Sequence, residues 1–438
     1  MKEFKINGVA SPLFGTISTK GDKSISHRAI IFASLASGTT QITNLLESDD
    51  VIRTIKAFQA MGVYIEKKND LYVVESKGIK RLTPAVKSIY FGNSGTTARL
   101  IIGILSGLPF KSRVYGDPSL TRRPMDRVIK PLKKMGASIS GENGNDSLPL
   151  TIQGIQLHGI DYKLPIKSAQ VKSSLLLAGL LANSETTLTE LDKTRDHTEL
   201  MLKTFGGNIK TVGNTITIQP STSLIGKKLT IPGDISSASF WIVGALILPE
   251  SNILLRNVGL NPTRTGIIDV LEKMGASLIK KNLTEISGEI CGDLVVKYQS
   301  LRATTINGHL VPRLIDEIPL IALLATQASG TTIIKGAEEL RVKETDRIEA
   351  VVNVLSKLGA NIRATDDGMI IKGNSSLTGG EVSSYGDHRI AMMIVIASLI
   401  IKDEIKVDDL SSISISYPDF FEDLKQLTKG KILEQLCF

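Results

Sequence analysis

The sequence predicts an α/β protein of two similar globular domains, each made of three βαβαββ units. The main observation is that one phrase recurs along the 438 residues: the end of an amphipathic helix, a glycine, then an apolar strand. A second phrase, a helix of small residues followed by a Thr-rich strand, precedes many copies of the first. With 42% hydrophobic and 22% charged residues, the composition is that of an ordinary globular protein with ample core.

The first phrase marks where helices end. Its glycines are spaced by roughly 70 to 85 residues, and a weaker sixth copy lies near residues 424–432. Glycine suits the left-handed backbone that closes a helix. The five clear copies end in Gly62, Gly136, Gly206, Gly275 and Gly359.

The second phrase places the other helices and strands. Small-residue helices are expected at 29–36, 175–182 and 321–328, and strands at 39–42, 186–189 and 331–334. A unit of about 70 residues is too large for a solenoid repeat and too small to be securely stable alone. Six units therefore favour two globes of three, whereas a string of unrelated α/β domains would not predict six recurrences.

The boundary between the globes is expected near residues 232–234. The first lobe then spans residues 20–234, and the second combines residues 1–19 with 235–438, its sheet completed by the N-terminal strand.

Composition argues against several classes of protein. The net charge of +8 is spread along the chain and aromatic residues make up 5%, which is unlike a nucleic-acid binder. The N-terminus has no signal or transit pattern, and no apolar run approaches the roughly 20 residues of a membrane span. The two cysteines and five histidines lack the spacing of a disulfide framework or metal site. A cytoplasmic protein without metal is expected.

The densest charged cluster is residues 341–347, RVKETDR, ahead of a helix whose apolar positions are 348, 351, 352, 355 and 358. Thr345 and Asp346 fit its N-cap or first turn. Fixed cations at a helix N-terminus favour a carboxylate or phosphate. The alternative is a solvated helix start with ordinary surface ion pairs.

Other polar loops also open helices. Lys23, Ser24 and Arg28 could face one anion, although a plain capped helix explains them equally well. There is no Walker phosphate loop. Pro124 suits the first turn of a helix, which would place Arg123 just before the helix N-terminus, but Arg123 could also be an ordinary surface arginine. His388 could simply bond locally at a helix start. The loops are residues 21–28, 91–99, 121–126, 168–174, 194–199, 312–317 and 386–389.

These motifs, in this order, resemble those of the 5-enolpyruvylshikimate-3-phosphate synthases, members of the enolpyruvyl transferase family. The strings are GDKSISHR, GNSGTTARL, RRPM, SAQVKSS, TRDHTE, RLIDE, RVKETDR, GDHRIAM and SYPDFF, and the match runs from about residue 11 to 421. The resemblance implies an inside-out α/β barrel fold, in which helix N-termini of both lobes converge on an active-site cleft. The first lobe would be mainly the shikimate-phosphate side.

The resemblance also implies the reaction. The enolpyruvyl group of phosphoenolpyruvate would pass to the 5-hydroxyl of shikimate 3-phosphate with release of phosphate, a step of chorismate and aromatic amino acid biosynthesis. No cofactor or metal is needed, and we expect a monomer with these two small-molecule partners.

Site residues follow position by position from the resemblance. Shikimate 3-phosphate contacts would be Lys23, Ser24, Arg28, Ser168, Ala169, Gln170, Arg195, Asp316 and Lys343. Phosphoenolpyruvate contacts would be Lys23, Gly95, Arg123, Gln170, Arg347, His388 and Arg389. The catalytic residues would be Lys23, Asp316 at the 5-hydroxyl, and Glu344 for proton exchange at the enolpyruvyl carbon. Partial burial would favour a neutral Glu344, whereas Lys343 and Arg347 would favour a charged one.

The chain departs from some members of the family. Ile415 stands where these have a phosphate-binding lysine, and Ala169 where others have serine; Arg195 belongs to one branch. The nearest alternative is UDP-N-acetylglucosamine enolpyruvyl transferase, which relies on a cysteine in the loop matching residues 113–123. That stretch has no cysteine here. A decayed, non-catalytic site is disfavoured because six charged residues of the motifs are all present: Lys23, Arg123, Asp316, Glu344, Arg347 and Arg389. Sensitivity to glyphosate stays open.

Overall fold

The computed structural model describes residues 4–7, 11–142, 144–221, 223–430 and 436–437. The chain divides into two compact units. Unit 1 comprises Met1–Lys20, Pro232–Thr284 and Ile290–Phe438, and unit 2 comprises Gly21–Ile231 with the short segment Glu285–Glu289. The sequence placed the two divisions after residues 19 and 234, and it placed the segment 285–289 in the second lobe.

Unit 2 contains three four-stranded sheets. Their strand orders are β14 (Lys228–Thr230), β3 (Ser37–Thr43), β5 (Leu71–Lys77), β4 (Tyr64–Lys68); β6 (Ile89–Tyr90), β7 (Lys111–Tyr115), β9 (Leu150–Gln153), β8 (Ser138–Gly141); and β10 (Asp161–Lys163), β11 (Thr186–Thr189), β13 (Thr215–Ile218), β12 (Ile209–Val212).

Unit 1 also contains three four-stranded sheets, except that the tip of one hairpin lies in the segment assigned to unit 2. Their orders are β2 (Phe14–Ser18), β15 (Asn252–Gly259), β17 (Glu289–Lys297), β16 (Ile279–Ile286); β18 (Thr305–Ile306), β19 (Thr331–Ile334), β21 (Gly368–Lys372), β20 (Asn361–Thr365); and β22 (Gly380–Val382), β23 (Ile405–Val407), β1 (Phe4–Ile6), β24 (Leu436–Cys437).

All six sheets share one topology. In the orders given, the first two strands are parallel. The second strand pairs antiparallel with the third. A parallel pair needs a crossover. In four of the sheets one helix lies between the first and the second strand in the chain: Gly95–Gly107, Ala169–Gly179, Ile318–Gln327 or His388–Ser398. The repeated βαβαββ architecture predicted from the sequence is confirmed.

Two first strands are exchanged between the units. Strand β2 directly precedes helix α1 (Lys23–Leu35) of unit 2 but pairs with β15 in unit 1. Strand β14 precedes helix α8 (Ile235–Ile247) of unit 1 but pairs with β3 in unit 2. The chain therefore passes from one unit to the other at the start of each of these helices.

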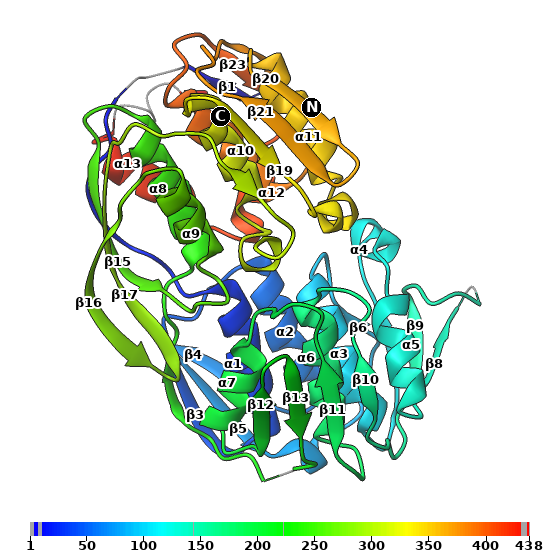
Figure 1. Cartoon of the computed structure of the whole chain (residues 1–438). Coiled ribbons are helices and arrows are strands. Elements are labelled where there is room, and N and C mark those ends of the chain that lie inside the picture. The colour runs from blue at the N-terminus through cyan, green and yellow to red at the C-terminus, as the bar shows by residue number, and fades with distance from the viewer. Residues whose placement is uncertain (1–3, 8–10, 143, 222, 431–435, 438) are drawn as a thin grey trace. The chain divides into compact units, whose positions relative to one another are not determined.

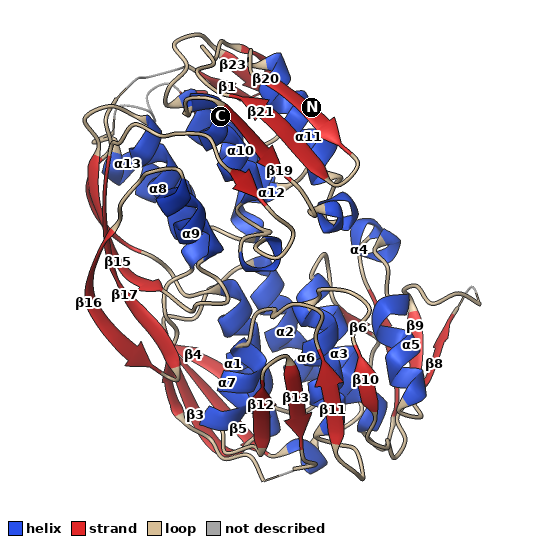
Figure 2. Ribbon diagram, viewed as in Figure 1, coloured by secondary structure: helices blue, strands red, loops and turns tan. Residues whose placement is uncertain are grey.

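In each unit the small-residue helices lie on the inner side of the sheets, as Figures 1 and 2 show. Six small-residue helices are almost wholly buried: α1, α3 (Gly95–Gly107) and α6 (Ala169–Gly179) in unit 2, and α8, α10 (Ile318–Gln327) and α12 (His388–Ser398) in unit 1. The more polar helices are α2 (Asp49–Ala60), α4 (Pro118–Arg122), α5 (Asp126–Lys134), α7 (His197–Thr204), α9 (Gly266–Lys273), α11 (Arg347–Lys357) and α13 (Phe420–Leu427). The helices predicted at 29–36, 175–182 and 321–328 lie largely within α1, α6 and α10, and the predicted strands lie in β3, β11 and β19.

The predicted glycine caps are confirmed. Gly62, Gly136, Gly206, Gly275 and Gly359 have φ of 87°, 95°, 90°, 89° and 90°. In the sixth copy, α13 is followed by Gly430 with φ 83°. The rest of that copy, residues 431–432, lies outside the described residues. Each of these glycines adopts a left-handed conformation that other residues enter at a cost.

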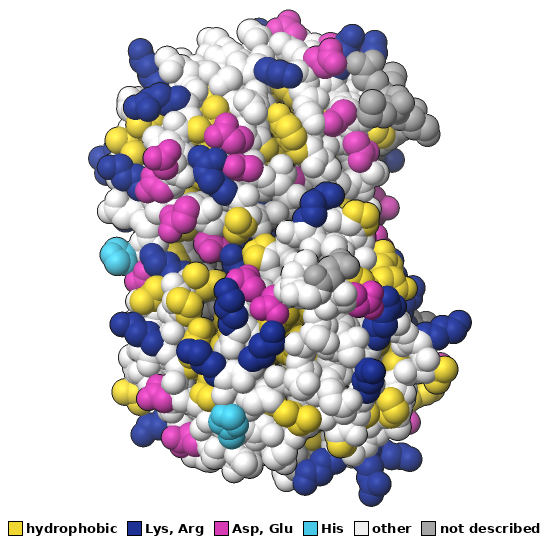
Figure 3. Space-filling view, turned by 90° about the vertical axis from the view of Figure 1, so that its right-hand side faces the viewer, with side chains coloured by type: hydrophobic (Ala, Val, Ile, Leu, Met, Phe, Trp, Pro, Cys, Tyr) yellow, Lys and Arg dark blue, Asp and Glu magenta, His cyan; other side chains and the backbone are white. Residues whose placement is uncertain are grey.

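The surface carries mixed charge. On the face drawn in Figure 3, Lys and Arg side chains are interspersed with Asp and Glu, and apolar side chains are scattered among them. Within the part of the chain that the structure describes, no helix has the length and apolar character needed to cross a bilayer.

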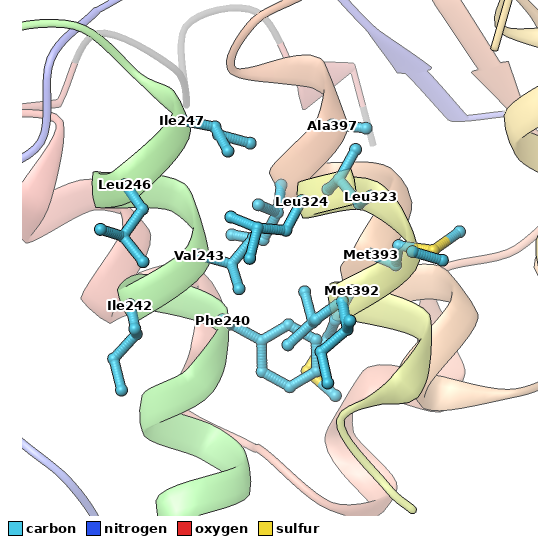
Figure 4. Close-up of a cluster of buried hydrophobic side chains, with 14 of the residues drawn as sticks. Phe240, Ile242, Val243, Leu246, Ile247, Leu323, Leu324, Met392, Met393 and Ala397 are labelled. Atoms are coloured by element: carbon cyan, nitrogen blue, oxygen red, sulfur yellow. The ribbon is translucent and has the colours of Figure 1, made fainter. Parts of the chain in front are cut away.

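The core of unit 1 forms where α8, α10 and α12 meet (Figure 4). Phe240 and Val243 of α8 lie among Leu324 of α10 and Met392 of α12, all buried. Full burial of such a side chain contributes about 1.5–3 kcal/mol. A separate cluster forms the core of unit 2. These cores fix the interior helices, whose N-terminal turns carry the residues described next.

Candidate active site

In unit 2, hydrogen bonds between side chains join the first two turns of α1, α2 and α3. His27 Nδ1 lies 2.7 Å from Thr54 Oγ1, which lies 2.7 Å from Thr97 Oγ1. Lys23 Nζ, at the first residue of α1, donates to Asp50 of α2 at 3.4 Å. The N-termini of three helices are thus gathered at one end of unit 2, where backbone N–H groups favour an anion.

Arg28 of α1 is 3% exposed and is held by three hydrogen bonds. Its Nε donates to Thr198 Oγ1 at 2.7 Å and one terminal nitrogen to Ser173 Oγ at 2.8 Å. The other terminal nitrogen donates to the carbonyl oxygen of Ser24 at 2.9 Å. Burial lowers the pKa of Arg28 to about 10, and the charge of Arg195 acts in the same direction. Arg28 therefore stays charged at neutral pH, with a second guanidinium in its surroundings.

Gly95, the first residue of α3, lies against two further guanidinium groups. A Cβ atom at Gly95 would lie 2.7 Å from Arg99 Nη1 and 3.2 Å from Arg123 Nη1. Arg99 Nη1 donates to Gln170 Oε1 of α6 at 2.6 Å, and Arg123 donates to Asn93 Oδ1. Arg99 and Arg123 are 7% and 9% exposed. This helix start therefore combines two cations with a glycine whose missing side chain lets both guanidinium groups lie close to the backbone.

Ser168 and Ala169 begin α6. Ser168 is the N-cap, and its Oγ accepts the backbone N–H of Val171 at 3.4 Å. Ala169 is the first helical residue and Gln170 the second; Gln170 Nε2 donates to Thr96 Oγ1 of α3 at 3.0 Å. The predicted residues of unit 2, from Lys23 to Arg195, thus lie on helix starts or the turns that precede them.

The expectation for Pro124 is wrong. It was placed in a first helical turn, but α4 ends at Arg122, Arg123 is its C-cap, and α5 begins after Met125. Pro124 lies in the turn between them, where its carbonyl oxygen accepts from Arg99 at 3.4 Å. Arg123 and Pro124 therefore lie between two short helices and not in the first turn of either.

In unit 1, three carboxylates surround Arg347, the first residue of α11, which is 1% exposed. Its Nε donates to Asp387 Oδ2 at 2.8 Å and its Nη2 to Glu344 Oε2 at 2.6 Å. Its Nη1 donates to Asp316 Oδ1 at 3.4 Å. Burial acts to lower the pKa of Arg347, but Asp387, Glu344 and Asp316 outweigh it and raise that pKa above its usual value.

Arg389 adds a second cation to this group. Its side chain lies 3.6 Å from Asp316 Oδ2 and donates to the Asp316 carbonyl oxygen at 3.2 Å. Asp387, fully buried, is the N-cap of α12 and accepts the Arg389 N–H at 2.8 Å. His388, the first residue of α12, is 4% exposed. Lys343 follows the 3-10 helix η3 (Glu338–Val342) and immediately precedes Glu344.

The cation cluster at 341–347 has divided roles. Asp346 is the N-cap of α11, as predicted, and accepts the N–H groups of Ile348 and Glu349, each at 3.1 Å. Arg341 is bound to Asp346 at 2.7 Å and to the Thr365 carbonyl oxygen at 2.7 Å. Arg341 therefore fastens the helix start, and Arg347 is the cation that meets the predicted acids.

Sequence reasoning missed Asp50, Arg99 and Asp387, although the last two stand inside quoted motifs. An acid directly before a helix is the signal for Asp387, because that position favours an N-cap. Asp50 and Arg99 gave no local signal, since their partners come from other helices.

The two sets suit different tasks. The residues of unit 2 offer cations and helix N-termini to anionic groups. Those of unit 1 offer two carboxylates, Asp316 and Glu344, whose charge is balanced by Arg347, as acid–base catalysis on an anionic substrate requires. Among the residues described, no group of three His, Cys, Asp or Glu side chains has the arrangement of a metal site.

Comparison with known proteins agrees over nearly the whole chain. The family model of EPSP synthase (3-phosphoshikimate 1-carboxyvinyltransferase) matches residues 9–424. The chain is 52% identical over 429 residues to a 3-phosphoshikimate 1-carboxyvinyltransferase of Oceanobacillus iheyensis, covering 98% of this chain and all of that one. It is 51% identical to the enzyme of that name from Streptococcus pyogenes, covering 98% and 99%.

Solved structures extend the likeness to the fold. The EPSP synthase of Acinetobacter baumannii, 42% identical, superposes with a TM-score of 0.87 over 98% of both chains. The enolpyruvyl transferase NikO of Streptomyces tendae, 17% identical, shares the fold with a TM-score of 0.77 over 97% of both. The family suggested by the nine sequence strings is confirmed, and UDP-N-acetylglucosamine enolpyruvyl transferase is not favoured. The chain belongs to the EPSP synthase (3-phosphoshikimate 1-carboxyvinyltransferase) family.

Proposed function

We propose that this chain transfers the enolpyruvyl group of phosphoenolpyruvate to the 5-hydroxyl of shikimate 3-phosphate and releases phosphate. The observation that carries the assignment of roles is the position of Asp316 and Glu344, two carboxylates bonded to one buried guanidinium at 3.4 and 2.6 Å. Such a group can exchange protons while holding an anionic substrate.

Both substrates carry a carboxylate and a phosphate, so bringing them together costs Coulomb repulsion. Two unit charges 4 Å apart interact by about 4 kcal/mol near a protein surface. Buried guanidinium groups and helix N-termini offset this repulsion without reorganising. In unit 2 these are Arg28, Arg99 and Arg123 with the starts of α1, α3 and α6.

The reaction adds a hydroxyl to the enol carbon while the methylene carbon gains a proton. The tetrahedral adduct then expels phosphate as the new methyl group loses a proton. Lys23 and Asp316 handle the hydroxyl proton, and Glu344 handles the proton on carbon. Because Lys23 belongs to unit 2 and the two acids to unit 1, the proposal requires both units to act on the same pair of substrates.

The substrate contacts include Lys23 and Asp316, which serve in binding as well as in catalysis. For shikimate 3-phosphate they are Lys23, Ser24, Arg28, Ser168, Ala169, Gln170, Arg195, Asp316 and Lys343. For phosphoenolpyruvate they are Lys23, Gly95, Arg123, Gln170, Arg347, His388 and Arg389. The hydrogen bonds among Arg99, Gln170 and Thr96 support a shared role for Gln170, since they tie α3 to α6.

A coupled phosphate-release assay with both substrates, against each alone, tests the reaction. Glu344→Gln should lower turnover at least about 100-fold, because a positioned acid–base group contributes roughly 10²–10⁴-fold. Glu349→Gln is the matched control: it removes an exposed carboxylate from the same helix start and should leave turnover near normal. Near-normal phosphate release by Glu344→Gln would show that its role is misassigned.

The assay also separates the alternative substrate. With UDP-N-acetylglucosamine in place of shikimate 3-phosphate, phosphoenolpyruvate should release no phosphate, since residues 113–123 contain no cysteine. We further expect a cytoplasmic monomer that needs no nucleic acid. Light scattering coupled to gel filtration checks the oligomeric state.

A further inference from the structure

Unit 2 contains three buried charges that the proposed reaction does not use. Lys172 of α6 has no exposed surface, and its Nζ lies 3.1 Å from Glu190 Oε2 and 2.7 Å from Glu199 Oε1. Glu190 follows β11, and Glu199 lies in α7. We call these residues the Lys172 triad. Buried ion pairs are weak contributors to stability compared with apolar packing, so the triad calls for another explanation.

The triad holds the residue before Arg195. Both the N–H and the hydroxyl of Thr194 donate to Glu190 Oε1, the N–H at 3.1 Å. Lys172 Nζ donates to the carbonyl oxygen of Thr194 at 3.4 Å. Each polar group of Thr194 is therefore bound by a member of the triad, and Thr194 is 4% exposed. This fixes the backbone from which Arg195 extends.

The same helices also hold Arg28. Ser173, next to Lys172 on α6, and Thr198, next to Glu199 on α7, lie 2.6 Å apart. Both accept hydrogen bonds from the Arg28 guanidinium, at 2.8 and 2.7 Å. The Lys172–Glu199 ion pair therefore joins α6 to α7, and each of its residues is next in sequence to one that accepts a hydrogen bond from Arg28.

We propose that the Lys172 triad is a positioning device, which sets Arg195 and Arg28 for the anionic groups of shikimate 3-phosphate without touching the substrate. This inference rests on the proposed function. Full burial of Lys172 excludes it from direct contact, and its bonds to Thr194 and Glu199 lead to both arginines. Substituting a positioning residue should change the affinity for the substrate it serves more than it changes kcat.

The main test is the double variant Lys172→Met/Glu199→Gln, which removes one charge of each sign and leaves the net buried charge unchanged. The matched control is Leu177→Ala, a cavity variant five residues further along the same helix and also buried. Shikimate 3-phosphate binding is measured by titration calorimetry, and KM and kcat for both substrates by phosphate release. Thermal unfolding shows that the two variants are folded and compares their stability.

The double variant should weaken shikimate 3-phosphate binding by between about 3-fold and 30-fold, the range for residues that act through others. The KM for phosphoenolpyruvate and kcat should stay within about twofold, and Leu177→Ala should bind shikimate 3-phosphate like the parent. Adding Arg195→Gln should lower the affinity for shikimate 3-phosphate less in the double variant than in the parent. The reason is that the triad is proposed to act on the substrate through Arg195, so the two losses overlap. Unchanged shikimate 3-phosphate affinity, or equal losses in the control, would overturn the proposal.

A milder variant covers the case in which the double variant does not fold. Thr194→Val keeps the shape of Thr194 and its backbone groups but removes the hydroxyl that donates to Glu190. It should weaken shikimate 3-phosphate binding about 3-fold, and unchanged binding would overturn the proposal. Failure of the proposed function is distinguishable, since then the parent protein itself would release no phosphate from the two substrates.

Discussion

Replacing Arg347 by methionine tests the electrostatic reasoning about unit 1 most directly. Methionine fills much of the same volume but leaves three carboxylates without their shared cation. Asp387 is affected most, because it is fully buried and loses both of its bonds to the guanidinium, at 2.8 and 3.3 Å. Glu344 and Asp316, with side chains 26% and 14% exposed, can gain water in exchange.

The expected loss of stability in Arg347→Met follows from the burial of Asp387. Removing one partner of a buried ion pair costs about 3–5 kcal/mol, because an uncompensated charge stays behind. In a unit of roughly 150–250 residues, each kcal/mol lowers Tm by about 2–4 °C. Arg347→Met should therefore unfold roughly 6–20 °C below the parent in differential scanning calorimetry, with phosphate release abolished.

A second substitution shows whether the stranded charge is the cause. Asp387→Asn keeps an oxygen that can accept the Arg389 N–H and so preserves the helix cap. The double variant Arg347→Met/Asp387→Asn should recover a large part of the lost Tm, although not activity. A Tm for Arg347→Met within about 2 °C of the parent would refute the reasoning, as would a double variant less stable than Arg347→Met.

Three further predictions concern unit 2 and α13. Gly95→Ala should raise the KM for phosphoenolpyruvate more than that for shikimate 3-phosphate in steady-state assays, because the new Cβ would displace the Arg99 and Arg123 guanidiniums. Burial raises the pKa of Asp423 to about 6, above the unfolded value of about 3.9. Stability should fall as pH rises through that window, and Asp423→Asn should gain more Tm at pH 8 than at pH 4. Burial lowers the pKa of His27 well below 6.5, so stability should be lost as pH falls below that value, and His27→Gln should lose less Tm between pH 7 and 5.

Each of these has a clear contrary result. Equal changes in both KM values would show that Gly95 is not specific to one substrate. If Asp423→Asn changes Tm by the same amount at pH 8 and at pH 4, the pKa of the Asp423 carboxyl is the same in the folded and the unfolded protein. If His27→Gln loses as much Tm as the parent on acidification, other groups account for the acid sensitivity.

Local patterns predicted much of the fold. The glycine caps, the small-residue helices and the Asp346 N-cap are decided by residues a few positions apart, so a single sequence carries them. Pairing partners far along the chain are not decided in this way. The boundaries expected at residues 19 and 234 already separate β2 and β14 from the helices that follow them, but no local pattern shows that β2 pairs with β15 or that β14 pairs with β3.

The candidate site divides along the same line. Lys23, Gly95, Arg347 and Arg389 stand at helix starts within recognisable motifs, so sequence could select them. The Lys172 triad joins α6, the end of β11 and α7, and its residues show no spacing that links them. From sequence alone, a lysine such as Lys172 is expected to be exposed. Only the packing of α6 against the neighbouring elements shows that it is buried.

The repeated architecture accounts for how one fold serves both tasks. Five of the six interior helices start with a side-chain N-cap that satisfies one backbone N–H group and leaves others for a ligand. An N-cap recurs at each of these helix starts, but the first helical residue differs. The pairs of N-cap and first helical residue are Asp22–Lys23, Ser94–Gly95, Ser168–Ala169, Asp234–Ile235 and Asp387–His388.

The sixth interior helix, α10, shows the exception that this arrangement permits. Its N-cap, Glu317, caps nothing with its side chain and instead accepts from Ser236 at the start of α8, where Arg264 also binds. That buried link fixes the backbone beside Asp316, which can then face Arg347 and Arg389. Side-chain capping thus falls to one residue at five helix starts and is absent at this one, and the residue after a cap can be a cation, as Lys23 is, or a glycine, as Gly95 is. The chemistry of the site is therefore assigned by one or two residues per helix start, on a backbone that the repeats keep constant.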